Sequence, residues 1–124
     1  MIDLLVAVEP HAEEIRDLVV RHASALAIPH LLDVEVAQAL RRLVRSGDLM
    51  VAAAGEALTA LGDLPLRRYP HLPLMTRVFE LRANVTAYDA VYLALAEGLD
   101  AELYTRDRRL ARARGHGARV RVIG

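Results

Sequence analysis

Short apolar segments alternate with longer amphipathic ones along this chain, and this alternation constrains the fold more than any other feature. Strand-like runs are predicted at residues 24–28, 64–69, 102–105 and 119–123, and helical runs at residues 9–22, 31–45, 48–61, 75–82, 86–98 and 106–114. Strands that are joined through helices pair in parallel, with helices covering both faces of the sheet. The sequence therefore predicts an α/β fold with a central parallel sheet, in one domain spanning residues 1–124.

The boundaries of three helices are predicted from their capping residues. Thr86 and Asp89 stand three residues apart, the spacing of a capping box in which the Thr86 hydroxyl accepts a hydrogen bond from the Asp89 backbone N–H. Gly98 is predicted to close this helix in the left-handed conformation, and Gly47 to close the helix at 31–45. Asp48 is the predicted N-cap of the helix at 48–61.

Composition excludes several kinds of site. There is no cysteine, so the chain has no disulfide, no thiolate metal site and no cysteine nucleophile. Its five histidines lack the short helical spacing of a zinc site, and we interpret them as structural or surface residues. The sequence shows neither a basic leader peptide nor an apolar run of about 20 residues. We therefore expect a cytoplasmic protein without a membrane segment.

The basic residues are distributed unevenly although the net charge is zero. All 16 are arginines, and seven of them lie between residues 106 and 121 beside a single acid, Asp107. Guanidinium groups clustered in this way suit phosphate recognition. A solvated surface is the equally open interpretation.

Three carboxylates are predicted at one edge of the sheet. Glu35 lies in the first turns of a helix, Asp89 starts the capped helix, and Asp107 follows the strand at 102–105. Ligand sites of parallel sheets gather outside the carboxyl ends of the strands, where the following helices begin. Taken singly, each acid is better explained by its helix: as a cap, a first-turn charge or a charge on an amphipathic rim. Gathered together they would repel one another unless a cation such as Mg²⁺ or Mn²⁺ lay between them.

The same stretches resemble a known family. The chain is similar to PIN-domain ribonuclease toxins of the VapC type, the toxin half of a toxin–antitoxin pair, through PHLLDVE at 29–35, NVTAYDA at 84–90 followed by ALAE at 94–97, and LYTRD at 103–107. The resemblance implies a three-layer α/β sandwich that hydrolyses RNA with Mg²⁺ or Mn²⁺, a VapB-type antitoxin as partner, and a homodimer. It implies metal-binding and catalytic roles for Glu35, Asp89 and Asp107, with Thr105 supporting the site.

Two further roles are expected around those acids. Thr86 is expected to support Asp89 through the capping box. The basic segment that follows Thr105 is expected to contact the RNA backbone through Arg106, Arg108, Arg109 and Arg112.

The amino terminus departs from the family pattern. PIN domains open with a hydrophobic strand that ends in an aspartate, and nothing before Asp3 supplies one. Residues 2–5 resemble the start of the helix that follows them, so Asp3 is not expected to replace that ligand. We therefore expect the central strand to be missing, through a late start of the chain rather than degeneration of the protein.

Two other functions are weighed against the nuclease. A catalytically inactive PIN-like module that binds an antitoxin or self-associates stays open, because one ligand is unaccounted for. A receiver-like phosphoacceptor domain is rejected because it needs a lysine, and the chain has none. Tyr88 and Tyr92, four residues apart on one helix, are interpreted as packing residues rather than as RNA-stacking ones.

Overall fold

A five-stranded parallel sheet forms the centre of the computed structural model, which describes residues 3–5 and 26–123. The strands are β1 (Asp3–Leu5), β2 (Leu26–Pro29), β3 (Arg67–Tyr69), β4 (Glu102–Thr105) and β5 (Arg119–Val122), in the order β3-β2-β1-β4-β5. All four pairings are parallel. The predicted α/β class is thereby confirmed, as is the edge position of the strand near residue 69, where proline is tolerated.

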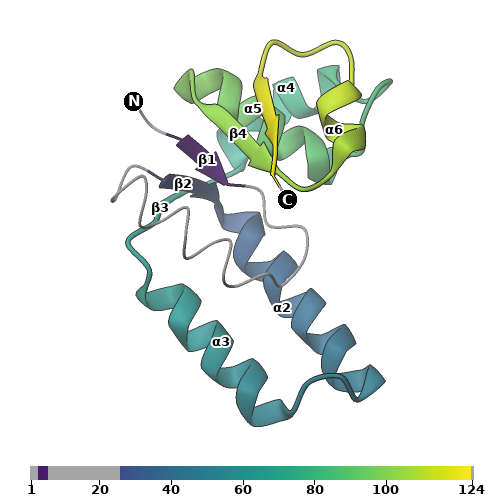
Figure 1. Ribbon diagram of the computed structural model, residues 1–124. Helices are drawn as coiled ribbons and strands as arrows, with labels where there is room; N and C mark the ends of the chain where they lie inside the picture. The colour runs from purple at the N-terminus through teal and green to yellow at the C-terminus, as the bar shows by residue number, and fades with distance from the viewer. Residues whose placement is uncertain (1–2, 6–25, 124) are drawn as a thin grey trace.

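The central strand is present, which corrects the expectation that it is missing. Residues 3–5 hydrogen-bond on both sides, with Leu4 beside Ala27 of β2 and beside Leu103 of β4 (Figure 1). Four residues of apolar sequence are too few to separate helical from strand periodicity, and pairing on two sides decides the outcome. Asp3 pairs with Leu26, the first residue of β2, so its backbone lies at the amino end of the sheet. It is therefore not placed at the carboxyl edge, as expected.

Six helical elements connect these strands in the described residues. They are α2 (His30–Ser46), α3 (Val51–Asp63), the 3-10 turn η1 (Leu72–Leu74), α4 (Met75–Glu80), α5 (Ala87–Leu99) and α6 (Arg108–Arg112). The helix predicted at residues 9–22 lies outside the described residues. Figure 1 shows α2 and α3 running side by side away from the sheet. No helix within residues 3–5 and 26–123 is long and apolar enough to span a bilayer.

The helix boundaries follow the predicted caps in part. Gly47 closes α2 in the left-handed region, with φ of 83°. The Asp48 prediction was wrong: Met50 is the N-cap of α3, and Asp48 instead accepts a hydrogen bond from Ser46. The Gly98 prediction was also wrong, because α5 runs on to Leu99 and Asp100 takes the left-handed position with φ of 51°. A short polar residue tolerates that conformation nearly as well as glycine does.

Helix α5 is the structural centre of the hydrophobic core. Every residue from Ala90 to Ala96 is buried, and the helix contacts β1, β2 and β4. A helix that is apolar all round is stable only inside a protein. The strands contribute the other wall of this core through Leu26, Ile28 and Leu103.

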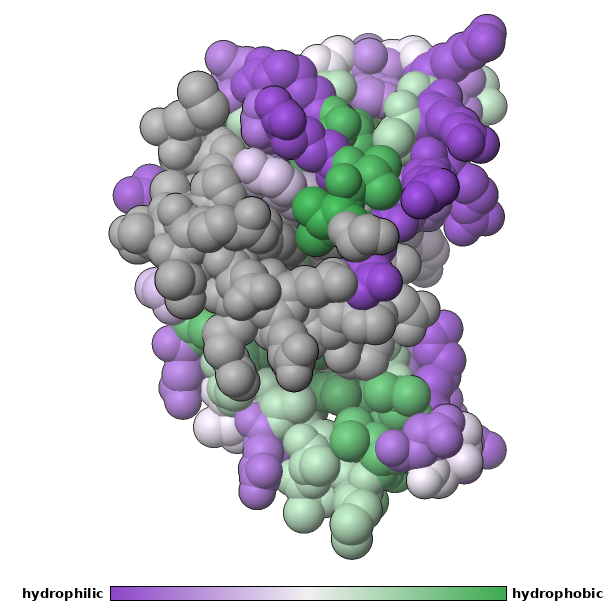
Figure 2. All heavy atoms as spheres, in the orientation of Figure 1, coloured by the Kyte–Doolittle hydropathy of each residue, from purple (hydrophilic) through white to green (hydrophobic). Residues whose placement is uncertain are grey.

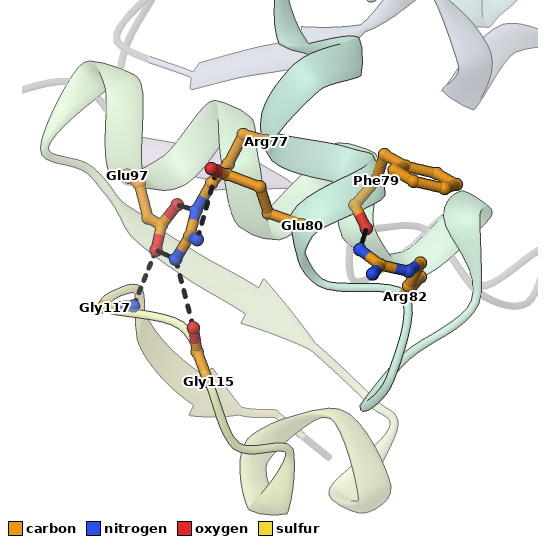
Figure 3. A network of polar contacts seen from close by, with 7 residues as sticks. All are labelled: Arg77, Phe79, Glu80, Arg82, Glu97, Gly115 and Gly117. Carbon is orange, nitrogen blue, oxygen red and sulfur yellow. Dashed lines mark hydrogen bonds and ion pairs between the residues drawn. The ribbon is translucent and has the colours of Figure 1, made fainter.

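A polar network fixes the far end of α5. Arg77 of α4 donates two hydrogen bonds to Glu97, of 2.8 and 2.9 Å, and a third to the Gly115 carbonyl (Figure 3). Glu97 also accepts from the Gly117 N–H at 2.6 Å. The Arg77 guanidinium and the Gly117 N–H lower the pKa of Glu97. The network therefore joins α4, α5 and the loop that leads into β5, which stabilises the carboxyl-terminal half of the sheet.

Candidate metal and phosphodiester site

The three predicted acids lie at the carboxyl edge of the sheet. Glu35 is in α2, which begins directly after β2; Asp107 is two residues beyond the end of β4; and Asp89 is in the first turn of α5. The sheet order changes direction between β1 and β4, so connections leave to opposite sides there. A crevice at such a switch point is where open parallel sheets bind ligands. The topology therefore brings together acids that are far apart in sequence.

Glu35 is held by a tyrosine that the sequence stage assigned to packing. The Tyr92 side chain is 1% exposed, and its hydroxyl donates a hydrogen bond to Glu35 Oε1. Burial raises the pKa of Glu35, the Tyr92 hydrogen bond lowers it, and the charge of Asp89 raises it. Burial and the neighbouring Glu35 raise the pKa of Tyr92, which keeps its proton on the oxygen. Tyr92 packs in the core as predicted, and it also orients a candidate ligand.

Asp89 is the middle member of the row of acids. Its backbone N–H donates to the Thr86 hydroxyl at 3.2 Å, which confirms the predicted cap of α5. Burial and the Asp107 charge raise the pKa of Asp89, while Thr86 and Arg109 lower it. Asp89 thus feels Asp107, and Glu35 feels Asp89. The three charges form a row, which is the arrangement that attracts a cation.

Asp107 is oriented from both sides. The Thr105 side chain is fully buried, and its hydroxyl accepts a hydrogen bond from the Asp107 backbone N–H at 3.0 Å. Asp107 in turn caps α6 by accepting from the Arg109 N–H at 2.9 Å. The Arg109 guanidinium lies 3.4 Å from the Asp107 carboxylate and is 91% exposed on its side chain. Such an exposed contact is weak and is easily exchanged for another anion.

A cleft of about 400 Å³ opens between the start of α5 and α6. Its lining includes the carboxyl-bearing residues Asp89 and Asp107 together with Thr86, Arg109 and Arg112. Glu35 does not line this cleft; it joins the row of charges through Asp89. The cleft therefore presents two acids and two arginines to the same space, which suits a metal-assisted reaction on a phosphate.

The donor set fits a hard divalent ion in chemistry but not as a closed cage. Carboxylate oxygens are the ligands that Mg²⁺ and Mn²⁺ select. Among residues 3–5 and 26–123, no three His, Cys, Asp or Glu side chains lie close enough together to hold one ion. Mg²⁺ commonly uses one or two protein carboxylates and completes its octahedron with water and substrate phosphate. An open site of that kind fits the residues present.

Another acid of the same region is already engaged. Asp33 accepts two hydrogen bonds from Arg68, of 2.8 and 3.1 Å, and so bridges α2 to β3. This bidentate pair explains why Asp33, two residues from Glu35, belongs to the scaffold rather than to the row of acids. The tyrosine that sequence reasoning missed as a site residue did carry a signal: Thr86, Asp89 and Tyr92 recur at three-residue spacing and share one face of α5.

Comparison with known proteins agrees with this geometry. Residues 1–116 match the model of the PIN domain. The chain is 49% identical over 96 residues to ribonuclease VapC1 of Mycobacterium tuberculosis, an alignment that covers 77% of this chain and 72% of the relative. It is 46% identical over 89 residues to VapC ribonuclease Mb0985 of Mycobacterium bovis, covering 72% and 70% of the two chains.

Solved structures share the architecture. The crystal structure of PAE2754 from Pyrobaculum aerophilum has a TM-score of 0.76 at 29% identity, over 96% of this chain and 83% of its own. DNA-bound VapBC from Salmonella typhimurium has a TM-score of 0.70 over 98% of each chain. At 16% identity, this second likeness shows the fold alone.

Proposed function

The chain belongs to the PIN-domain family, within which it is of the VapC type, and on that premise we propose that it is a divalent-metal-dependent endoribonuclease, the toxin of a toxin–antitoxin pair. The observation that carries the proposal is the row of Glu35, Asp89 and Asp107 at the switch point of the sheet. The curated relatives are named ribonucleases, and their alignments span most of this chain. Residues 1–124 act as one domain in this proposal.

The ligands of the ion are Asp89 and Asp107 in the cleft, with Glu35 behind them in the row. Bound there, Mg²⁺ or Mn²⁺ supplies an activated water and neutralises charge that develops on the phosphodiester. Because the described acids do not enclose an ion by themselves, phosphate oxygens of the RNA complete the site. Metal affinity is then expected to be weak in the absence of RNA.

The protein's own groups prepare that site. Tyr92 donates to Glu35 and so favours its ionised form, against the effect of burial. The Thr105 hydroxyl, by accepting from the Asp107 N–H, fixes the direction in which Asp107 leaves β4. Arg109, which loosely contacts Asp107, is free to move to a phosphate once a cation occupies the carboxylate. Thr86 holds the first turn of α5, and with it Asp89.

The partners follow from the same premise. Two of the structural neighbours are VapBC assemblies, in which a toxin of this fold is bound to its antitoxin. A VapB-type antitoxin is therefore the proposed protein partner, RNA the substrate, a homodimer the proposed assembly and the cytoplasm the place of action. Co-expression of the chain with the adjacent reading frame, followed by size-exclusion chromatography, tests the antitoxin and the dimer together.

Cleavage of labelled RNA tests the catalytic assignment. With Mg²⁺ present, the protein is expected to cut RNA, and Asp89→Asn is expected to lose that activity while keeping the cap, because the capping hydrogen bond uses the Asp89 backbone. Glu56→Gln is the matched control, since Glu56 is an exposed acid of α3. Equal cleavage by Asp89→Asn and by the control would reject the assignment.

One observation favours a second candidate, the catalytically inactive PIN-like module. β1 ends at Leu5, so the described central strand carries no carboxylate at its carboxyl end. A site with one acid fewer holds a cation less tightly. Calorimetry with Mn²⁺ in the presence of a non-cleavable RNA analogue separates the candidates: binding that is lost in Glu35→Gln supports the enzyme, and its absence in both supports the module.

A further inference from the structure

We infer that Arg108 and Arg112, here called the α6 ridge, bind successive phosphates of the RNA strand as it leaves the row of acids. The inference rests on the ribonuclease function proposed above and narrows it to a path across the surface. Of the arginines expected at sequence level to contact RNA, it selects two and assigns a different part to Arg109.

The carboxyl-terminal arginines fall into two groups by their partners. Arg119 donates to Asp100 at 2.8 Å, and Arg121 donates to Glu102 at 2.8 Å, so both are engaged with acids at the other end of β4 and β5. Arg109 contacts Asp107. Arg108 and Arg112 are exposed, and within residues 3–5 and 26–123 neither has a hydrogen bond or an ion pair. Their charge is therefore available to a ligand.

The two arginines share one face of α6. They stand four residues apart, which places them about 6 Å apart along the helix axis on the same side. A second cleft of about 400 Å³ is lined by Arg108, Ala111, Arg112 and Val122. Val122 of β5 is 42% exposed and gives this cleft an apolar floor. Planar guanidinium groups above such a floor suit a sugar–phosphate chain.

The second cleft continues the first one. Arg112 lines both, so a strand held at the acids through one phosphate reaches the ridge without crossing an acidic surface. Figure 2 shows predominantly hydrophilic surface on the side of the molecule where Figure 1 places α6. The charge and the continuity of the two clefts favour RNA over an acidic peptide, because a peptide carboxylate would also be repelled by Asp89 and Asp107.

Salt-dependent RNA binding tests the ridge. A fluorescent single-stranded RNA is titrated with the full chain carrying Asp89→Asn, in EDTA so that no cleavage occurs, at several salt concentrations. Replacing both ridge residues, Arg108→Gln with Arg112→Gln, is expected to reduce the slope of log K against log salt by about 1.4, since each lost phosphate contact on a single strand removes about 0.7. At about 0.1 M salt, the affinity is expected to fall by roughly tenfold or more.

A double control carries the same change in net charge. Arg119→Gln with Arg121→Gln removes two arginines that are engaged with Asp100 and Glu102, and it is expected to leave the slope unchanged. Thermal melts of both double variants report folding. The inference is overturned if the ridge variant keeps the parental slope, if the control lowers the slope equally, or if the ridge variant loses binding only to polyglutamate. Because cleavage is not measured, these outcomes are independent of whether Asp89→Asn abolishes nuclease activity.

Discussion

Removing the hydroxyl group of Tyr92 tests whether the core and the site are linked as the structure indicates. Tyr92→Phe deletes one oxygen atom from a side chain that is 1% exposed and leaves the packing of the ring unchanged. The lost hydrogen bond has Glu35 as its acceptor, and the Glu35 carboxylate is half-buried. A hydrogen bond to a charged group contributes about 1.5–3 kcal/mol, and phenylalanine leaves no unpaired donor behind. We expect the free energy of unfolding at pH 7 to fall by about 2 kcal/mol.

The same variant has a pH dependence of known sign. The Tyr92 hydrogen bond lowers the pKa of Glu35, so deleting it raises that pKa further. When Glu35 is protonated at low pH, the hydrogen bond joins two neutral groups and contributes only about 1 kcal/mol. The loss of stability is therefore expected to grow as the pH rises and Glu35 ionises. Urea denaturation of both proteins across this range measures it.

Tyr88→Phe is the matched control for this experiment. Tyr88 lies one turn earlier, in the first turn of α5, and its side chain is 64% exposed, so its change is expected to stay within about 0.5 kcal/mol at every pH. The reasoning is refuted if Tyr92→Phe is no more destabilising than Tyr88→Phe at neutral pH. A loss of stability that is the same at acid and neutral pH would show that Tyr92 acts through packing alone.

Four other predictions follow from the same structure. Asp89→Asn is expected to lower the rate of RNA cleavage by about 100-fold or more, equivalent to roughly 3 kcal/mol of transition-state stabilisation, in a single-turnover assay. Glu35→Gln is expected to raise the melting temperature at neutral pH, because burial and Asp89 raise the folded-state pKa of Glu35 and the wild type loses stability as the pH rises through that pKa. Glu97 has the opposite sign: its lowered folded-state pKa contributes stability above the ordinary value of 4.5 that disappears as the pH falls through the folded-state pKa, so acid melts of Glu97→Gln should show a smaller loss. Gly115→Ala should destabilise more than Gly47→Ala in urea: φ is positive at both, at a cost of about 1–2 kcal/mol, but only at Gly115 would the new Cβ lie 2.5 Å from another side chain.

Several local features of this protein were predictable because they depend on residues that are neighbours in sequence. The Thr86 cap, the left-handed Gly47 and the strand at Glu102–Thr105 each follow from a few adjacent side chains and were found where expected. The three acids were also located correctly at the carboxyl edge of the sheet. That prediction needed only the rule that parallel strands present their carboxyl ends on one side.

Tertiary structure decided the features that depend on distant partners. Residues 3–5 carry no strand signal of their own, and they form the central strand because β2 and β4 offer hydrogen bonds on both sides. The Tyr92–Glu35 hydrogen bond joins residues 57 apart, and no local pattern distinguishes that tyrosine from one that only packs. Likewise, arginines that look alike in sequence divide into engaged and available ones only when the strands bring Asp100 and Glu102 beside two of them. Local propensity acts over a few residues, whereas pairing and charge neutralisation are settled by whichever groups the fold brings into contact.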